Sequence, residues 1–222
     1  MAGYRRWRFG VVLVAALLLV VVQPVLSGFV DEQGSFDVLF SLLIVAVLLS
    51  LFEEREHRIL GMVLALAAIL AVWLGAVFVN ARWLALLGNL CAVSFFGFAL
   101  SGILAAIFRG NVTGDAIFGA ICGYLLLGII WGIIYSALEM MSPGSFRTNE
   151  QLASTLADPR QCRGLLSYYS FVTLTTVGYG DVLPTSPIAR TLAWLEAMAG
   201  QIYLAVLVAG LVGLRVSRAS KA

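Results

Sequence analysis

Long apolar stretches alternate with short polar breaks along most of the chain. A helix that crosses the hydrocarbon core of a bilayer needs about 20 mostly apolar residues. Six stretches come close to that length or exceed it: Phe9–Leu26, Phe36–Phe52, Ile59–Val79, Trp83–Phe108, Val112–Met140 and Pro187–Val216. The breaks between the first five are short and polar: DEQGS, EEREHR, NAR and RGNVTGD. The pattern predicts six membrane-spanning helices.

One polar segment is long, and it lies between the fifth and the sixth stretch: MSPGSFRTNEQLASTLADPRQCRG. Within it, Thr148 and Gln151 have the spacing of a capping box, and Asp158–Pro159 would end a helix, so a short surface helix is expected there. A shorter semi-apolar piece, Leu165–Thr175, follows this segment. It leads into the polar, glycine-broken sequence TTVGYGD at residues 175–181.

The composition supports the membrane assignment. The chain has 222 residues, of which 61% are hydrophobic and 12% charged, and its mean hydropathy is +0.99. A soluble domain of this size could not bury so much apolar surface, so the sequence predicts an all-α integral membrane protein. Cys91 and Cys122 fall in apolar stretches, where cysteine behaves as a small buried hydrophobe. Cys162, in the polar loop, is expected to be a free thiol.

The placement of lysine and arginine predicts the orientation, because these residues are enriched in cytoplasmic loops. With a cytoplasmic N-terminus, nine basic residues lie inside and five outside, and the outside set is Arg82, Arg147, Arg160, Arg163 and Arg190. Both termini are then cytoplasmic, in a multi-pass protein of the cell (inner or plasma) membrane. The first stretch, with YRRWR before it and VLS before Gly28, also resembles a secretory signal peptide. Its removal would leave the other five helices oriented as before.

The TTVGYGD sequence places irregular backbone beside membrane helices, where it is tolerated only if protein covers it or it lines a watery cavity. Gly178 and Gly180 alternate with residues that carry side chains, and glycine readily adopts a positive φ. Alternating left- and right-handed conformations would turn successive carbonyl oxygens to one side, above the hydroxyl of Thr176. The segment therefore predicts a ladder of oxygen ligands for a bare cation. One loop cannot surround an ion, so several chains must contribute, and rotational symmetry is the natural arrangement.

Residues 165–181, LLSYYSFVTLTTVGYGD, resemble the pore helix and selectivity filter of the potassium channel family, whose filter is built from four TVGYG loops. The following LPTSPIARTLAWLEAMAGQIYLAVLVAGLVG resembles the inner helix of that family. The resemblance covers roughly residues 112–216 and leaves the four leading helices without a matching motif. It implies a homotetrameric pore in the lipid bilayer, with a re-entrant pore helix and filter loop and with K⁺ as the permeant ion. Each chain would combine a four-helix membrane bundle (1–110) with a pore domain (111–222).

The resemblance also assigns roles to individual residues. Backbone carbonyls and the Thr176 hydroxyl would bind dehydrated K⁺, with Thr176, Val177, Gly178 and Tyr179 as ligands and Thr175 and Gly180 as supporting residues. The family holds the aspartate after the filter with an aromatic residue, usually tryptophan, so a hydrogen bond from Tyr168 to Asp181 is expected. Where some bacterial members have a second acid, this chain has Val172, which leaves Asp181 without a carboxyl partner.

In the inner helix, Gly200 matches the family's hinge and Gly210 is a second candidate, with simple helix packing as the alternative role for Gly200. Helical spacing from Gly200 directs three residues to the cavity: Gln201, Leu204 and Val208. Glu196 is a carboxylate inside a predicted membrane helix, which costs about 2.5–3.5 kcal/mol, so it needs a partner or a proton. A structural or filter-supporting role is expected for it. Four further glycines are expected to serve helix packing: Gly119, Gly123, Gly128 and Gly132.

Other function classes have less support. The chain has one histidine, no clustered metal-ligand spacing, no G-x-S-x-G and no phosphate-binding loop, so no enzyme activity, cofactor or nucleic-acid partner is expected. A potassium uptake transporter with related pore loops is an alternative, but such proteins usually carry several degenerate pore repeats, and this chain has one intact repeat. An accessory membrane protein with a relic pore is another. The fourth stretch has no basic residue in its interior, so no charged voltage sensor is expected. Only RVSRASKA follows the inner helix, so no cytosolic regulatory domain is expected.

Overall fold

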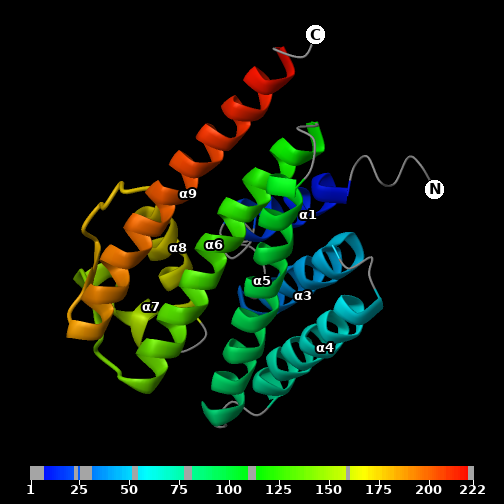
Figure 1. Cartoon of the computed structure of the whole chain (residues 1–222). Helices are drawn as coiled ribbons and strands as arrows, with labels where there is room; N and C mark the ends of the chain where they lie inside the picture. The colour runs from blue at the N-terminus through cyan, green and yellow to red at the C-terminus, as the bar shows by residue number, and fades with distance from the viewer. Residues whose placement is uncertain are drawn as a thin grey trace.

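The computed structural model describes residues 8–22, 25, 32–51, 55–77, 82–109, 114–158 and 161–219. Helices make up most of these residues (Figure 1). The first half contains α1 (Arg8–Leu17), the π-helical turn η2 (Leu18–Val22), α3 (Glu32–Leu51), α4 (Arg55–Val77) and α5 (Arg82–Arg109). The second half contains α6 (Gly114–Met141), β1 (Phe146–Thr148), the 3₁₀ turn η3 (Glu150–Leu152), α7 (Ala153–Ala157), α8 (Cys162–Leu174), β2 (Val182–Pro184) and α9 (Pro187–Ala219).

Within the described residues, each of the six predicted apolar stretches contains a helix, the conformation that satisfies backbone hydrogen bonds within one segment. Three helical runs in the described residues are long and apolar enough to cross a membrane: Arg82–Ala105, Ile117–Met141 and Pro187–Gly210. The apolar helical runs of the first three stretches are shorter: Phe9–Val22, Gly34–Ser50 and Ile59–Leu74. The chain is therefore a mostly helical membrane protein, while membrane crossing by all six helices stays a prediction.

The leading helices pack against α6 around one apolar core. Neighbouring helices α3, α4 and α5 are in contact, α5 packs along α6, and α1 contacts both α3 and α6 (Figure 1). Phe40 of α3 meets Phe96 of α5 edge to face, with ring centroids 5.5 Å apart, beside the ring of Phe95. The core continues to Cys122 and Leu126 on α6. The core therefore includes residues on both sides of position 110, and α6 packs against the leading helices as well as against α8. The division of the chain into two domains at this position stays a prediction.

A second apolar cluster joins the end of α6 to the polar loop and α8. Tyr135, Phe146 and Tyr169 pack edge to face in a triangle with centroid distances of 5.4, 5.2 and 5.3 Å. β1 pairs antiparallel with β2, and the Glu139 carboxylate accepts the backbone N–H of Phe146 at 3.1 Å. The loop before α8 and the strand after the TTVGYGD segment are thereby fixed to each other and to α6.

The predicted surface helix is present as α7, but its predicted cap is wrong. Thr148 lies in β1 opposite Val182, so its backbone is committed to the strand pair. The next residue takes the capping role, because Oδ1 of Asn149 accepts the N–H of Leu152 at 3.1 Å where η3 begins. The helix that follows ends at Ala157, just before the expected stop.

Cys162 is a free cysteine, as predicted, and it is buried rather than exposed in the loop. Its side chain lies in the second apolar cluster at the start of α8. Burial, with a smaller contribution from Glu139, raises the pKa of the Cys162 thiol to about 12. The thiolate is the reactive form of cysteine, so Cys162 is an inert packing residue near neutral pH.

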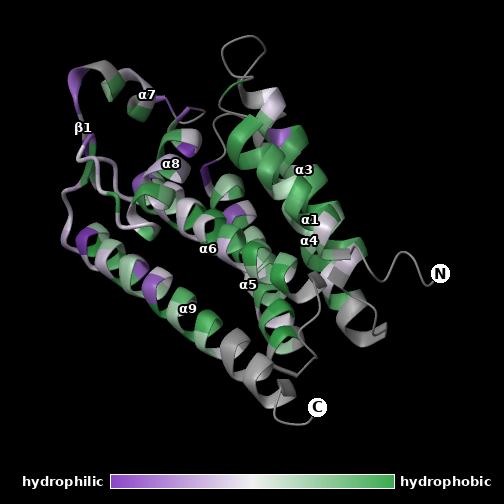
Figure 2. Ribbon diagram, turned by 90° about the horizontal axis from the view of Figure 1, so that it is seen from above, coloured by the Kyte–Doolittle hydropathy of each residue, from purple (hydrophilic) through white to green (hydrophobic). Residues whose placement is uncertain are grey.

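α9 is a single continuous helix that carries much exposed apolar surface. It packs against α8 and α6 on one side, and Figure 2 shows its apolar residues along a helix that stands at the edge of the molecule. Several of these residues are about half exposed: Trp194 53%, Met198 50%, Ile202 56% and Val208 57%. An apolar face of this length needs lipid or other subunits to cover it.

Candidate functional site

The TTVGYGD segment folds back against the end of α8. Beyond Leu174, the backbone N–H groups of Val177 and Gly178 both donate to the carbonyl of Val172, at 3.0 and 3.3 Å. In a planar trans peptide the N–H and the preceding C=O point in opposite directions. The carbonyl oxygens of Thr176 and Val177 therefore point away from α8, as an oxygen ladder requires.

Positive φ angles alternate along the segment, with values of 59° at Thr176, 61° at Gly178 and 79° at Gly180. The alternation predicted from the two glycines is present. The sequence did not reveal that Thr176 shares it, and Thr176 is the one non-glycine residue with a positive φ in the described part of the chain. Such a conformation costs on the order of 1–3 kcal/mol, so the hydrogen bonds around Thr176 must stabilise it.

In a single chain the segment is open on the side away from α8. Val177 is 52% exposed and Tyr179 is 71% exposed, although both side chains are large and mainly apolar. Thr175, Thr176 and both glycines are exposed as well. One chain thus presents carbonyl oxygens on the side of the segment that faces away from α8, and this side is open to other molecules.

The predicted hydrogen bond between Tyr168 and Asp181 is present. The Tyr168 hydroxyl donates to Oδ2 of Asp181 at 2.7 Å, and the backbone N–H of Val182 donates to Oδ1 at 3.0 Å. Val172, at the position where some family members have an acid, is half-buried and offers its backbone carbonyl to the segment. The carboxylate of Asp181 is therefore held from α8 and from the start of β2.

At Gly200, α9 passes close to the end of α8. A methyl group at Gly200 would stand 2.5 Å from the carbonyl oxygen of Leu174 and 2.9 Å from its Cδ1 atom. The Tyr124 hydroxyl of α6 donates to the same Leu174 carbonyl at 3.2 Å. The geometry thus provides a packing reason for glycine at this position, and its role as a hinge stays a prediction.

The other predicted packing glycines have close neighbours on other helices. A methyl group at Gly128 would meet the ring of Phe171 at 2.5 Å, and one at Gly132 would meet the backbone of Ser167 at 2.9 Å. Gly119 faces the ring of Phe9 in the same way, and Gly123 faces Tyr203. These glycines allow α6 to approach α8, α1 and α9 closely.

The inner-helix residues separate into an exposed set and a buried one. Gln201, Leu204 and Val208, the predicted cavity residues, are all exposed in the single chain. Glu196, in contrast, is fully buried, and the Tyr135 hydroxyl donates to its Oε2 atom at 2.6 Å. Ser170 Oγ lies 2.5 Å from its Oε1 atom. The sequence predicted a partner or a proton for Glu196 but did not identify these two residues.

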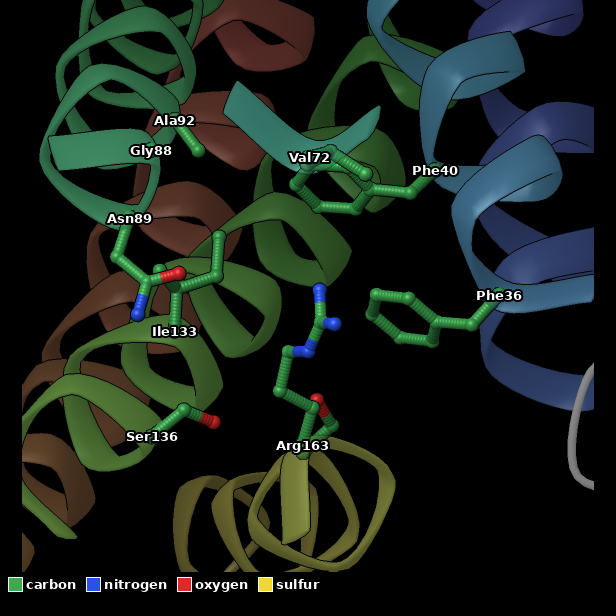
Figure 3. Close-up of a pocket in the computed structure, with 10 residues that line it drawn as sticks. Phe36, Phe40, Val72, Gly88, Asn89, Ala92, Ile133, Ser136 and Arg163 are labelled. Atoms are coloured by element: carbon green, nitrogen blue, oxygen red, sulfur yellow. The ribbon is translucent and has the colours of Figure 1, made fainter. Parts of the chain in front are cut away.

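Sequence reasoning also missed a link between the start of α8 and the leading helices. Arg163 forms an ion pair with the buried Asp37 of α3 at 3.6 Å, and its guanidinium lies 5.4 Å from the centre of the Phe36 ring. Figure 3 shows Arg163 reaching toward Phe36 across a small space, with Asn89 and Ser136 on the far side. The space measures about 20 Å³, enough for one water molecule.

Comparison with known proteins places these features in a family. A model of the ion channel family matches residues 165–214, which hold most of α8, the TTVGYGD segment and most of α9. The inward rectifier potassium channel Kirbac3.1 of Paramagnetospirillum magnetotacticum is 31% identical over 87 residues, which are 37% of this chain and 24% of that protein. Protein LctB of Bacillus caldotenax is 30% identical over 128 residues, which are 50% of this chain and 91% of that protein. No solved structure matches the chain.

The family model covers the region that carries the alternating backbone and most of the helix after it. The chain belongs to the potassium channel family. Membership points to ion transport in a membrane rather than to catalysis.

Proposed function

We propose that the chain is one subunit of a homotetrameric, K⁺-selective channel that conducts potassium passively across the cell membrane. The observation that carries the proposal is the alternation of positive φ at Thr176, Gly178 and Gly180, with backbone N–H groups of the segment turned toward α8. This conformation offers carbonyl oxygens on one side, the ligands that replace the hydration shell of K⁺ in potassium channel filters. The ligands in this chain are the carbonyls of residues 176–179 and the Thr176 hydroxyl.

Four copies around one axis complete the site. Each copy supplies one wall, and its neighbours cover the exposed Val177 and Tyr179 and part of the apolar face of α9. α8 acts as the re-entrant pore helix and directs its C-terminal, partially negative end toward the cavity. Gln201, Leu204 and Val208 line this cavity, and four residues support the filter: Thr175, Gly180, Tyr168 and Asp181.

The proposed membrane topology has six crossing helices and cytoplasmic termini. Two contacts support it, because each joins residues that this topology places on the outer side. Arg82, where α5 begins, donates to the carbonyl of Met140, where α6 ends, at 2.9 Å. Arg163 pairs with Asp37 near the start of α3. Residues 1–110 then form a membrane bundle around the pore domain of residues 111–222.

The test is a flux measurement on purified protein in liposomes, followed by reversal potentials in a planar bilayer under a K⁺/Na⁺ gradient. Unitary current steps with a strong preference for K⁺ are expected. A permeability ratio near one would overturn the selectivity, and ion flux without unitary steps would favour an uptake transporter. Absence of flux from well-folded tetramers would favour an accessory protein.

A matched pair of glycine variants tests the filter itself. No atom lies within 4 Å of the position that a new methyl group would take at either Gly178 or Gly97, but Gly178 has a φ of +61°, whereas Gly97 lies within the regular helix α5. A left-handed conformation costs an alanine about 1–2 kcal/mol. Gly178→Ala is therefore expected to abolish K⁺ selectivity or flux while Gly97→Ala retains both. Equal behaviour of the two variants would contradict a filter at this segment.

A further inference from the structure

Glu196 of α9 lies against α6 and α8, and its neighbours there limit which atoms can donate hydrogen bonds. The residue is 0% exposed. Its Oε2 atom accepts from the hydroxyl of Tyr135 on α6, at 2.6 Å, and its Oε1 atom lies 2.5 Å from Ser170 Oγ on α8. Ser170 Oγ also lies 2.7 Å from the carbonyl oxygen of Gly128 on α6.

The two short contacts of Ser170 cannot both be made by its own proton. A serine hydroxyl has one hydrogen to donate, a backbone carbonyl only accepts, and an ionised carboxylate only accepts. An ionised Glu196 would leave Ser170 between two acceptors with a single hydrogen. A protonated Glu196 resolves the count, because it donates from Oε1 to Ser170 Oγ while Ser170 donates to Gly128.

The surroundings favour the neutral form as well. Within the described residues the structure records no ion pair for Glu196. The titratable groups that face it are the hydroxyls of Tyr124 and Tyr135 on α6 and of Tyr169 on α8, which are neutral at physiological pH. A buried charge without a counter-charge is strongly unfavourable.

We propose that Glu196 is a protonated carboxylic acid in the conducting channel and that it positions the filter through the chain Tyr135–Glu196–Ser170–Gly128. This inference rests on the proposed function. Ser170 is on the helix that carries the filter, four residues before its last residue, Leu174, and Glu196 is on the helix that lines the cavity. The hydrogen-bonded chain fixes both helices to α6. Loss of the proton at high pH leaves Ser170 with one hydrogen for two acceptors, Glu196 and the carbonyl of Gly128, so one of its two bonds is lost. It also leaves a bare charge between the helices, and the filter loses its support.

The proton is tested without any measurement of conduction. Infrared difference spectra between wild type and Glu196→Gln, recorded at neutral pH in a detergent that has no ester groups, are expected to contain the C=O stretch of a protonated carboxylic acid. The matched control is Glu150→Gln at an exposed position of the loop, which is expected to lack this band. Only carboxylate bands in the Glu196 difference spectrum would overturn the proposal.

The positioning role is tested by flux in liposomes across a range of pH. Glutamine can accept from Tyr135 and donate to Ser170, so Glu196→Gln is expected to conduct at neutral pH and to lose the decline at alkaline pH that wild type shows. Glu196→Leu keeps the approximate size of the side chain but cannot form the hydrogen bonds, so this variant is expected to lose flux. Ser170→Ala and Tyr135→Phe are expected to lower flux about tenfold, which corresponds to ~1.4 kcal/mol. The same alkaline decline in wild type and Glu196→Gln, or full flux through Glu196→Leu, would refute the role.

The two sets of experiments separate this inference from the proposed function. A wild-type protein that shows the carboxylic acid band but passes no K⁺ would overturn the channel and leave the protonation in place. A K⁺-selective channel without the carboxylic acid band would support the channel and overturn the protonation of Glu196.

Discussion

Thr176 has a positive φ because its neighbours are held on both sides. Its own N–H donates to the carbonyl of Thr173 at 2.9 Å, and the N–H of Val177 donates to Val172 at 3.0 Å. These two bonds fix the peptide planes before and after Thr176, so the last turn of α8 determines the angle. Gly178 adopts its positive φ without the steric cost of a Cβ atom. The orientation of the carbonyls thus depends on the end of α8 as well as on the glycines.

The hydrogen bond between Tyr168 and Asp181 predicts the effect of removing one atom, the hydroxyl oxygen of Tyr168. Tyr168→Phe removes the hydroxyl and keeps the ring, so Asp181 loses one of its two described hydrogen bonds. A lost hydrogen bond to a charged group is worth about 1.5–3 kcal/mol, which is enough to favour a collapsed filter. Single-channel recordings are expected to show lower open probability and faster inactivation.

Tyr168→Trp is the matched variant, because the indole N–H can donate where the hydroxyl did. It is expected to recover part of the open probability that Tyr168→Phe loses. Currents of Tyr168→Phe that are indistinguishable from wild type would show that this hydrogen bond does not support the filter.

At the scale of elements, α8 packs along its length against α6 and contacts α9 at its C-terminal end. Ser167 lies against Gly132, Ser170 donates to Gly128, and the carbonyl of Leu174 accepts from Tyr124. Small residues let the backbones approach, and hydroxyl groups bridge them, which is the usual basis of helix association in membranes. The position of the TTVGYGD segment therefore depends on the packing of three helices.

The close approach of α9 predicts the effect of a single methyl group. Gly200→Ala would bring a Cβ atom to 2.5 Å from the Leu174 carbonyl oxygen, and overpacking of this kind costs about 1–3 kcal/mol. We expect a lower thermal midpoint for the purified protein and a reduced K⁺ flux. Gly102→Ala in α5, where no atom lies within 4 Å, is the control and is expected to match wild type. If Gly200→Ala altered opening and closing without a change in the thermal midpoint, the residue would act as a hinge instead.

Much of this element arrangement could be predicted from the sequence, and the limits have physical causes. Apolar length predicted the helices, and the glycines of TTVGYGD predicted the alternating backbone, because both are local properties of the chain. The family pattern supplied the pairing of Tyr168 with Asp181. The partners of Glu196 and the pairing of Arg163 with Asp37 were missed, since each joins residues far apart in the sequence. Such contacts depend on how helices rotate against each other, which local periodicity does not determine.

At the scale of the whole molecule, the four leading helices share a core with α6 and also reach α8 directly. Asp37 is almost fully buried, and Arg163 extends from the second position of α8 to meet it beside Phe36. Removal of one partner from a buried ion pair leaves the other charge without compensation, whereas removal of both is often tolerated. The leading helices are therefore expected to steady the start of α8.

A double-mutant cycle measures this connection. Arg163→Gln and Asp37→Asn are each expected to lower the thermal midpoint of the purified protein, and the double variant is expected to lose less than the sum of the two. The coupling free energy is expected to fall in the range of about 0.5–3 kcal/mol found for interacting pairs. Strictly additive effects would show that the two side chains do not stabilise each other.

The distribution of charge over the leading helices predicts how the channel responds to voltage. Movement of one elementary charge across the membrane field is worth about 2.3 kcal/mol per 100 mV, and steep gating requires several such charges in each subunit. α5, the fourth of the apolar helices, begins at Arg82 and ends at Arg109 and has no basic residue between them. Arg82 is bound to the carbonyl of Met140 at the end of α6, so it joins two helix ends rather than forming part of a mobile row of charges. The arginines of α4 are confined to its first turns, at Arg55 and Arg58.

We therefore expect a shallow conductance–voltage relation in planar bilayers, set by ions moving within the filter, and unchanged by Arg82→Gln. A relation as steep as several elementary charges per subunit would show that these helices move charge by a route absent from this arrangement.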